Sequence, residues 1–233
     1  NTINMWRNKT SDLIKMVEKY REISNKYQTL DVKHQELEKK YRESTLIYDD
    51  FSESELDKRK WMLATVTLGE GKYWTYQEPD AIVKTSGECL EITVNPFTRK
   101  NNQVQIFDNP KHLYISTHKF ITPPGTIATF ECDMSATTYN AVPSDVYDAF
   151  VILDLCDLAT GIALVFIATS DKVALIYERL LLPDVTTKET AFTNVIETSI
   201  PTKAGQMHHY KITYERSQNT AIWYANSEQV YVV

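Results

Sequence analysis

Carboxylates set among apolar residues are the groups of this sequence best suited to chemistry. One stretch reads Ile176-Tyr177-Glu178-Arg179-Leu180, and on a strand Tyr177 and Arg179 would share one face while Glu178 takes the other. Ile176 and Leu180 then flank Glu178, which predicts a carboxylate that points into a cavity. Burial raises the pKa of a carboxylate, so Glu178 is a candidate catalytic acid or base. The alternative is an ion pair at a sheet edge with a neighbouring Arg or Lys.

Asp154 and Asp157 are two further candidates for catalysis, because they lie in or beside the apolar run from Phe150 to Leu158. Buried carboxylates need partners, so one interpretation is a pair that faces a ligand. The other interpretation is that Asp157 caps the turn before Thr160-Gly161.

Aromatic residues are frequent after residue 60 and offer binding surfaces for a ligand. Such rings stack on sugars and hydrophobic molecules, and they also fill the cores of sandwiches. We take the following as candidate ligand-binding residues: Tyr177, Arg179, Trp223, His209 and Tyr147.

Several classes of function are disfavoured by what the sequence lacks. The five histidines and three cysteines have no metal-ligand spacing, so we expect neither a metal nor a cofactor. No Gly-x-Ser-x-Gly motif and no glycine-rich phosphate loop occur, and there are only six glycines. The net charge of −6 argues against a nucleic-acid partner. The longest apolar stretches, such as Gly161 to Ala168, are too short for a membrane span.

The stretches of sequence that contain these residues have the patterns of strands and turns. No alternation of strands with helices interrupts them, so we expect a mainly β fold with antiparallel strands, as in a sandwich or barrel. Turn signals such as Pro123-Pro124-Gly125 separate the β-forming runs. The expected strands are 62–68, 73–77, 81–84, 89–94, 104–107, 113–116, 126–134, 149–155, 162–168, 173–178, 192–196, 209–214, 221–224 and 229–232.

The N-terminal segment has the pattern of an α-helical coiled coil. From Thr10 to Ser44 there is neither Gly nor Pro. Apolar, Tyr and His residues recur there at strict steps of three and four, as in a heptad seam. The seam consists of Leu13, Met16, Tyr20, Ile23, Tyr27, Leu30, His34, Leu37 and Tyr41.

Charges beside this seam favour self-association in parallel. Lys26 and Lys33 at g positions would meet Asp31 and Glu38 at e positions of a partner helix. We therefore expect a homo-oligomer formed through residues 13–41. The alternative is an amphipathic helix that lies on its own sandwich.

Three stretches resemble the concanavalin A-like lectin and glucanase superfamily, in its family-16-like branch. They are Tyr48-Asp49-Asp50-Phe51 followed by Trp61, then Ile115 to Met134, and finally His209 to Tyr214 followed by Ile222 to Asn226. Within that superfamily, Tyr177 to Leu180 looks like an uncharacterised branch with a Tyr-Glu-Arg-Leu strand. The resemblance implies a jelly-roll sandwich whose concave sheet binds the ligand.

The resemblance also bears on catalysis. Glucanases of this type place Glu-x-Asp-x-x-Glu on one strand, with the outer carboxylates as nucleophile and general acid. The nearest match here runs from Ile152 to Asp157, so the nucleophile position holds an isoleucine. A retaining glucanase is therefore not expected.

The sequence thus predicts a coiled-coil segment over residues 1–46 and a β-sandwich domain over residues 47–233. The expected function is binding of a glycan or a small hydrophobic molecule by a module that the coiled coil oligomerises. The alternative is a cofactor-independent isomerase, cyclase or lyase that acts on a small molecule. Three cysteines without a pairing pattern favour reduced thiols and a cytoplasmic protein. One disulfide with one free thiol is an alternative, and so is secretion after processing of the N-terminus.

Overall fold

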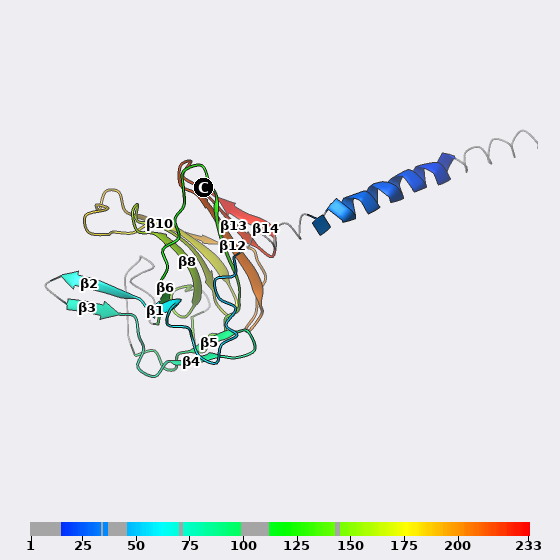
Figure 1. Cartoon of the computed structure of the whole chain (residues 1–233). Coiled ribbons are helices and arrows are strands. Elements are labelled where there is room, and N and C mark those ends of the chain that lie inside the picture. Colours follow the sequence, from blue (N-terminus) through cyan, green and yellow to red (C-terminus); the bar gives the residue numbers. More distant parts are fainter. Residues whose placement is uncertain (1–14, 34, 37–45, 70–71, 99–111, 143–144) are drawn as a thin grey trace, which may run out of the picture. The chain divides into compact units, whose positions relative to one another are not determined.

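The computed structural model describes residues 15–33, 35–36, 46–69, 72–98, 112–142 and 145–233 (Figure 1). The chain divides into two compact units, Asn1–Asp50 and Phe51–Val233. The first unit contributes a helix and the second contributes all of the strands.

The helix occupies residues 15–33 and 35–36, which confirms the helical prediction over the part of the segment that the structure describes. Its side chains at the seam spacing are 43–77% exposed: Met16, Tyr20, Ile23, Tyr27 and Leu30. Lys26 Nζ lies 3.0 Å from Glu22 Oε1 one turn earlier, as expected for an i, i+4 pair. The remaining seam residues, Leu13, His34, Leu37 and Tyr41, are outside the described residues. Within those residues, no helix has the length and apolar character needed to cross a membrane.

Two four-stranded antiparallel sheets make up most of the second unit. Sheet I has the order β14 (Glu228–Val232), β13 (Thr220–Ala225), β12 (His208–Glu215) and β7 (Ala128–Met134). Sheet II has the order β11 (Phe192–Glu197), β10 (Val173–Arg179), β9 (Ile162–Ala168) and β8 (Val151–Asp157). The prediction of a mainly β chain with antiparallel sheets is therefore confirmed.

The chain enters sheet I with β7, forms all of sheet II as an up-and-down series, and then returns to sheet I. On its return β12 pairs with β7, and Ile212 lies opposite Phe130. Three two-stranded sheets precede this series: β1 (Trp61–Leu63) with β6 (Tyr114–Ser116), β2 (Thr65–Gly69) with β3 (Lys72–Thr75), and β4 (Ile82–Thr85) with β5 (Leu90–Thr93).

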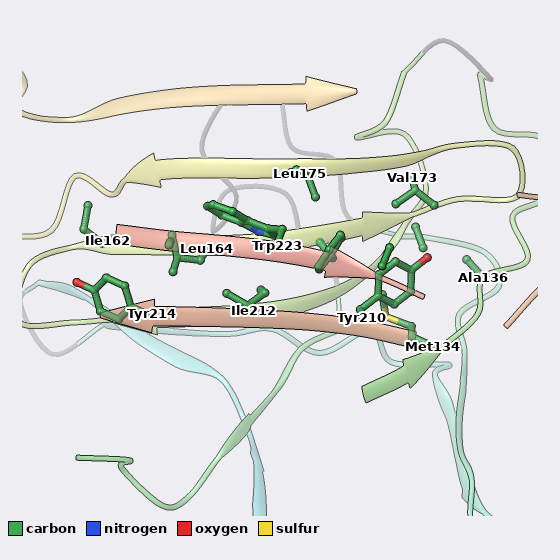
Figure 2. Close-up of a cluster of buried hydrophobic side chains, with 14 residues drawn as sticks. Met134, Ala136, Ile162, Leu164, Val173, Leu175, Tyr210, Ile212, Tyr214 and Trp223 are labelled. Carbon is green, nitrogen blue, oxygen red and sulfur yellow. The ribbon is translucent and has the colours of Figure 1, made fainter. Parts of the chain in front are cut away.

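The main core lies between the two sheets, which pack face to face as a sandwich (Figure 2). In β12 every second residue is buried, because successive side chains of a strand point to opposite faces. Tyr210 on β12 meets Phe166 on β9, with ring centroids 4.7 Å apart. Trp223 on β13 meets Tyr177 on β10 at 6.4 Å. These aromatic contacts join sheet I to sheet II.

The opposite face of sheet II is also covered. All seven residues of β9 are buried, which requires protein on both faces of the strand. A second cluster accounts for this, with Ala163, Val165 and Ile167 of β9 packed against residues of β10 and of the turn before β8. This second face is where the candidate site lies.

Candidate functional site

Asp154 and Glu178 lie on the face of sheet II that points away from the sandwich core, here called the Asp154 face. Its members on β8 and β10 follow from strand alternation: Ile152, Asp154 and Cys156, together with Ile176 and Glu178. Strand β9 separates the two strands, and Ala163 lies opposite both Cys156 and Glu178. Asp154 lies opposite Val165, two residues along β9 from Ala163, so Asp154 and Glu178 are diagonal to each other across β9.

Glu178 is fully buried, with 0% of its surface exposed. Thr193 lies directly opposite it on β11, and the Thr193 hydroxyl donates a hydrogen bond of 2.9 Å to Glu178 Oε2. Ile176 and Leu180 belong to the cluster on the same face as Glu178, as strand alternation predicts, and the cavity expected there stays a prediction. Thr193 was missed, since no local pattern in the sequence indicates which residue lies across from Glu178.

Asp154 has the most unusual environment on this face. Its Oδ1 atom is shielded from solvent and has no hydrogen-bond partner among the described residues. The residue as a whole remains partly exposed. Loss of hydration, and then the nearby charge of Glu178, raise the pKa of Asp154 to about 7. An unpaired, partly dehydrated carboxyl group that titrates near neutrality can bind a ligand or transfer a proton.

Tyr147 adds a phenol to the same face. It lies in the turn before β8, and its ring meets Phe150 edge to face at 6.4 Å. Its hydroxyl is buried without a hydrogen-bond partner in the described part of the chain. Burial, followed by the charges of Glu178 and Asp145, raises the pKa of Tyr147 to about 12, so it remains a neutral phenol.

Cys156 lies on the same face of sheet II. Burial first, and then Asp154, Asp157 and Glu178, raise the pKa of its thiol. The thiolate is the nucleophilic form, so Cys156 contributes bulk rather than reactivity. The charge of Glu178 raises the pKa of Asp154, of Tyr147 and of Cys156, so each of the three lies within electrostatic reach of Glu178.

Asp157 lies apart from this group and stabilises a turn. Its Oδ1 accepts a hydrogen bond of 3.0 Å from the backbone N–H of Ala159, and its Oδ2 lies 3.4 Å from Arg216 Nε. Asp154 and Asp157 are three positions apart on β8, so they face opposite sides of sheet II. The structure therefore favours the turn-capping interpretation of Asp157 over a ligand-facing pair.

The other candidate ligand-binding residues do not join Asp154. Tyr177 and Trp223 belong to the core between the sheets, where Trp223 is 0% exposed. Arg179 lies on the Tyr177 side of β10, as predicted from alternation.

His209 lies on the far side of sheet I. Its Nδ1 is 3.0 Å from Asp133 Oδ1, and its Nε2 is 3.6 Å from Glu131 Oε2. Within the described ranges, no group of three His, Cys, Asp or Glu residues has a geometry that could hold a metal ion.

The pKa of Asp154 has a measurable consequence for stability. Its ordinary value is 3.8, so the folded state holds this proton more tightly than the unfolded chain does. The free energy of unfolding should fall as the pH rises from about 4 to about 7, by at most about 4 kcal/mol, and then level off. Asn cannot ionise, so Asp154→Asn should remove this decline in the free energy of unfolding. The variant should therefore be more stable than the wild type at pH 8. Urea unfolding at steps of pH measures the difference between the two proteins.

The exposed residue Asp80 provides the matched control for this prediction. Asp80→Asn should give a curve of stability against pH parallel to that of the wild type, because an exposed carboxyl group gains little from folding. Parallel curves for Asp154→Asn and wild type would show that Asp154 ionises freely in the folded state.

These features define an antiparallel β-sandwich protein with a fully buried glutamate, Glu178, and a partly exposed aspartate, Asp154, on one sheet face. Residues 48–233 match the model of a family of unknown function, DUF6081, and the chain belongs to this family. No curated protein and no solved structure matches the chain.

Proposed function

We propose that this protein binds a small hydroxyl-bearing molecule, such as a glycan unit, on the Asp154 face. One observation carries the proposal: Asp154 Oδ1 and the Tyr147 hydroxyl are both shielded from solvent without a hydrogen-bond partner in the described chain. A buried polar group left unpaired costs about 1–3 kcal/mol, and a ligand that pairs with it recovers that cost. A purely hydrophobic ligand would leave both groups unpaired, so a ligand with hydroxyl groups fits better.

The proposal extends to the fold family. We assign the sandwich to the jelly-roll type of the concanavalin A-like superfamily. Support comes from the path of the chain, in which β7 and β12 pair in sheet I while β8 to β11 form sheet II between them. The sequence resemblance gives the same assignment, and sugar binding is common among proteins of that superfamily.

A second candidate function is acid–base catalysis without a cofactor, as in an isomerase, cyclase or lyase. The observation that favours it is the pKa of Asp154 of about 7, beside the buried carboxylate of Glu178. A group that titrates near neutrality can donate and accept a proton within one reaction cycle. Ile152 shares this face and cannot act as a nucleophile, so the reaction would not be that of a retaining glucanase.

The helix supplies the assembly part of the proposal. Residues 13–41 would form a parallel coiled coil with the same segment of other copies, which buries the exposed Ile23 and Leu30 side chains. In parallel register, Lys26 reaches Asp31 of the neighbouring helix. Several linked copies of a weak site bind a multivalent glycan with higher avidity than one copy does. Free thiols at all three cysteines support an intracellular setting.

Titration of the full-length protein with mono- and disaccharides, followed by NMR, tests the binding function. We expect chemical-shift changes on β8 and β10 and a rise in melting temperature. Tyr147→Phe should lower the affinity about tenfold, because it removes one hydrogen bond from a buried site. Asp133→Asn, on the far side of sheet I, is the control and should leave the affinity unchanged.

The same titration separates the two candidate functions. Conversion of the bound sugar over time, abolished by Asp154→Asn, would favour the enzyme. Stable binding without conversion supports the binding module. The absence of any shift on β8 and β10 across the sugars would contradict both.

A further inference from the structure

Thr193 lies on the Asp154 face and contacts Glu178 directly. The two residues are opposite each other on β11 and β10, and directly opposite residues carry their side chains on the same face of a sheet. The Thr193 hydroxyl lies 2.9 Å from Glu178 Oε2 and donates a hydrogen bond to it. Glu178 is 0% exposed, so this bond is made inside the protein, where a hydrogen bond to a carboxylate is stronger than in water.

Both ends of β11 are anchored to β10, which fixes the register that places Thr193. Next to Thr193, Phe192 packs edge to face against Tyr177 on the core side of sheet II, with ring centroids 5.0 Å apart. Directly after the strand, the Thr198 backbone N–H and hydroxyl both donate to the Val173 carbonyl, at 3.1 Å and 2.8 Å. A slip of one residue would move every side chain of β11 to the opposite face, so these contacts keep the Thr193 hydroxyl on its present face.

The charge of Glu178 depends on the donors around it. Burial favours the neutral form of a carboxyl group, whereas each hydrogen bond donated to the carboxylate favours the charged form. Thr193 need not be the only donor for this to hold, because each donor contributes separately. The titratable groups that act on one another here come from three places: Asp145 and Tyr147 in the turn before β8, Asp154, Cys156 and Asp157 on β8, and Glu178 on β10.

We propose that Thr193 is a positioning residue of the Asp154 face, whose hydroxyl holds the side chain of Glu178 in place as a carboxylate. Thr193 thereby acts on Asp154 without touching it, through the charge of Glu178, which raises the pKa of Asp154. This inference rests on the proposed function, in which Asp154 binds the ligand or transfers a proton. A threonine that only filled space would need its methyl group and not its hydroxyl, so the two roles can be separated.

The test follows the two carboxyl groups as the pH changes. Full-length protein with isotope-labelled aspartate and glutamate is titrated from about pH 4 to about pH 9, and NMR gives the midpoint of ionisation for Asp154 and for Glu178. Thr193→Val keeps the shape of the side chain and removes the hydroxyl. We expect the Glu178 midpoint to rise and the Asp154 midpoint to fall from about 7 by at least about half a unit, because neutral Glu178 no longer repels a charge on Asp154.

The opposite direction of the two changes distinguishes positioning from a structural effect. A variant that merely loosened this face would admit water and lower both midpoints, because hydration favours the charged form of each carboxyl group. Thr193→Ser keeps a hydroxyl and should leave both midpoints close to those of the wild type.

Three further variants assign the effect to Glu178. Glu178→Gln should lower the Asp154 midpoint by itself. Adding Thr193→Val to Glu178→Gln should change the Asp154 midpoint no further, since Thr193 acts only through the charge of Glu178. Thr213→Val removes a hydroxyl from the far side of sheet I and should leave both midpoints unchanged.

Opposite movement of the two midpoints in Thr193→Val, reversed in Thr193→Ser, would support the positioning role. Midpoints that stay unchanged, or that both fall, would overturn it. Neither result depends on whether a sugar binds, so the sugar titrations test the proposed function separately. Sugar-induced shifts on β8 and β10, together with unchanged carboxyl midpoints in Thr193→Val, would overturn this inference and leave the binding function standing.

Discussion

Replacing Ile23 and Leu30 together by Asn is expected to abolish the proposed self-association of the helix and to leave the protein monomeric. Both side chains are exposed, at 43% and 64%, and both belong to the apolar seam predicted from the sequence. Burial of one such side chain contributes about 1.5–3 kcal/mol, whereas an exposed Lys–Asp pair contributes about 0.3–0.5 kcal/mol. Loss of two apolar layers should therefore remove most of the association energy. Sedimentation velocity at several concentrations measures the change.

Val32 offers the matched control, because it is apolar and 54% exposed on the same helix but lies outside the seam. Val32→Asn should leave the sedimentation coefficient unchanged. Deletion of residues 1–46 should give a folded monomer, as the second compact unit begins at Phe51. An oligomer that survives this deletion would show that assembly does not depend on the helix.

Truncation of Trp223 is expected to have the largest effect on stability. The side chain is 0% exposed and contacts Tyr177 of sheet II and Tyr231 of sheet I, at ring distances of 6.4 Å and 5.6 Å. Trp223→Ala should lower the free energy of unfolding by about 3–5 kcal/mol, because it removes apolar contacts and leaves a cavity between the sheets. Urea unfolding followed by circular dichroism measures the loss.

Two further variants serve as controls for this prediction. Trp223→Phe keeps an aromatic ring in place and removes an indole N–H that has no hydrogen-bond partner among the described residues, so it should cost less than half as much. Trp74→Ala removes the same side chain from β3, where Trp74 is 38% exposed, and should cost clearly less. Equal losses for Trp223→Ala and Trp74→Ala would mean that Trp223 does not join the sheets.

The positions of the strands along the chain were largely predictable from the sequence. The runs 173–178 and 209–214 correspond to β10 and β12 within one residue at either end. In β12 the burial of one face imposes a period of two, whereas β10 is buried on both faces and reads as a short continuous apolar run. The expected strand 62–68 is instead two strands, β1 and β2, divided at Ala64. Its N–H and C=O bond to Leu113 and Tyr76, which no local pattern indicates. The expected strand 104–107 is outside the described residues.

The candidate site was predictable only in part, because a site depends on which strands are neighbours. Alternation correctly turned Glu178 away from Tyr177 and Arg179. The same argument cannot tell that β9 lies between β8 and β10, or that Thr193 meets Glu178. Residue type alone suggested that Trp223 and His209 bind the same ligand as the acidic residues. The pairing of the strands places Trp223 in the core between the sheets and His209 on the far side of sheet I.

The pairing of β7 with β12 also governs how this protein is made. During synthesis β7 leaves the ribosome first, and its partner appears only after residues 135–207 have been added. At about 5–20 residues per second, β7 waits several seconds without its sheet I partner β12, while β8 to β11 can already pair with their neighbours in order. Sheet II is therefore expected to form first and to act as the template on which β7 is held. Until β12 is made, β7 exposes unpaired backbone N–H and C=O groups, so we expect newly made chains to be prone to aggregate through this strand.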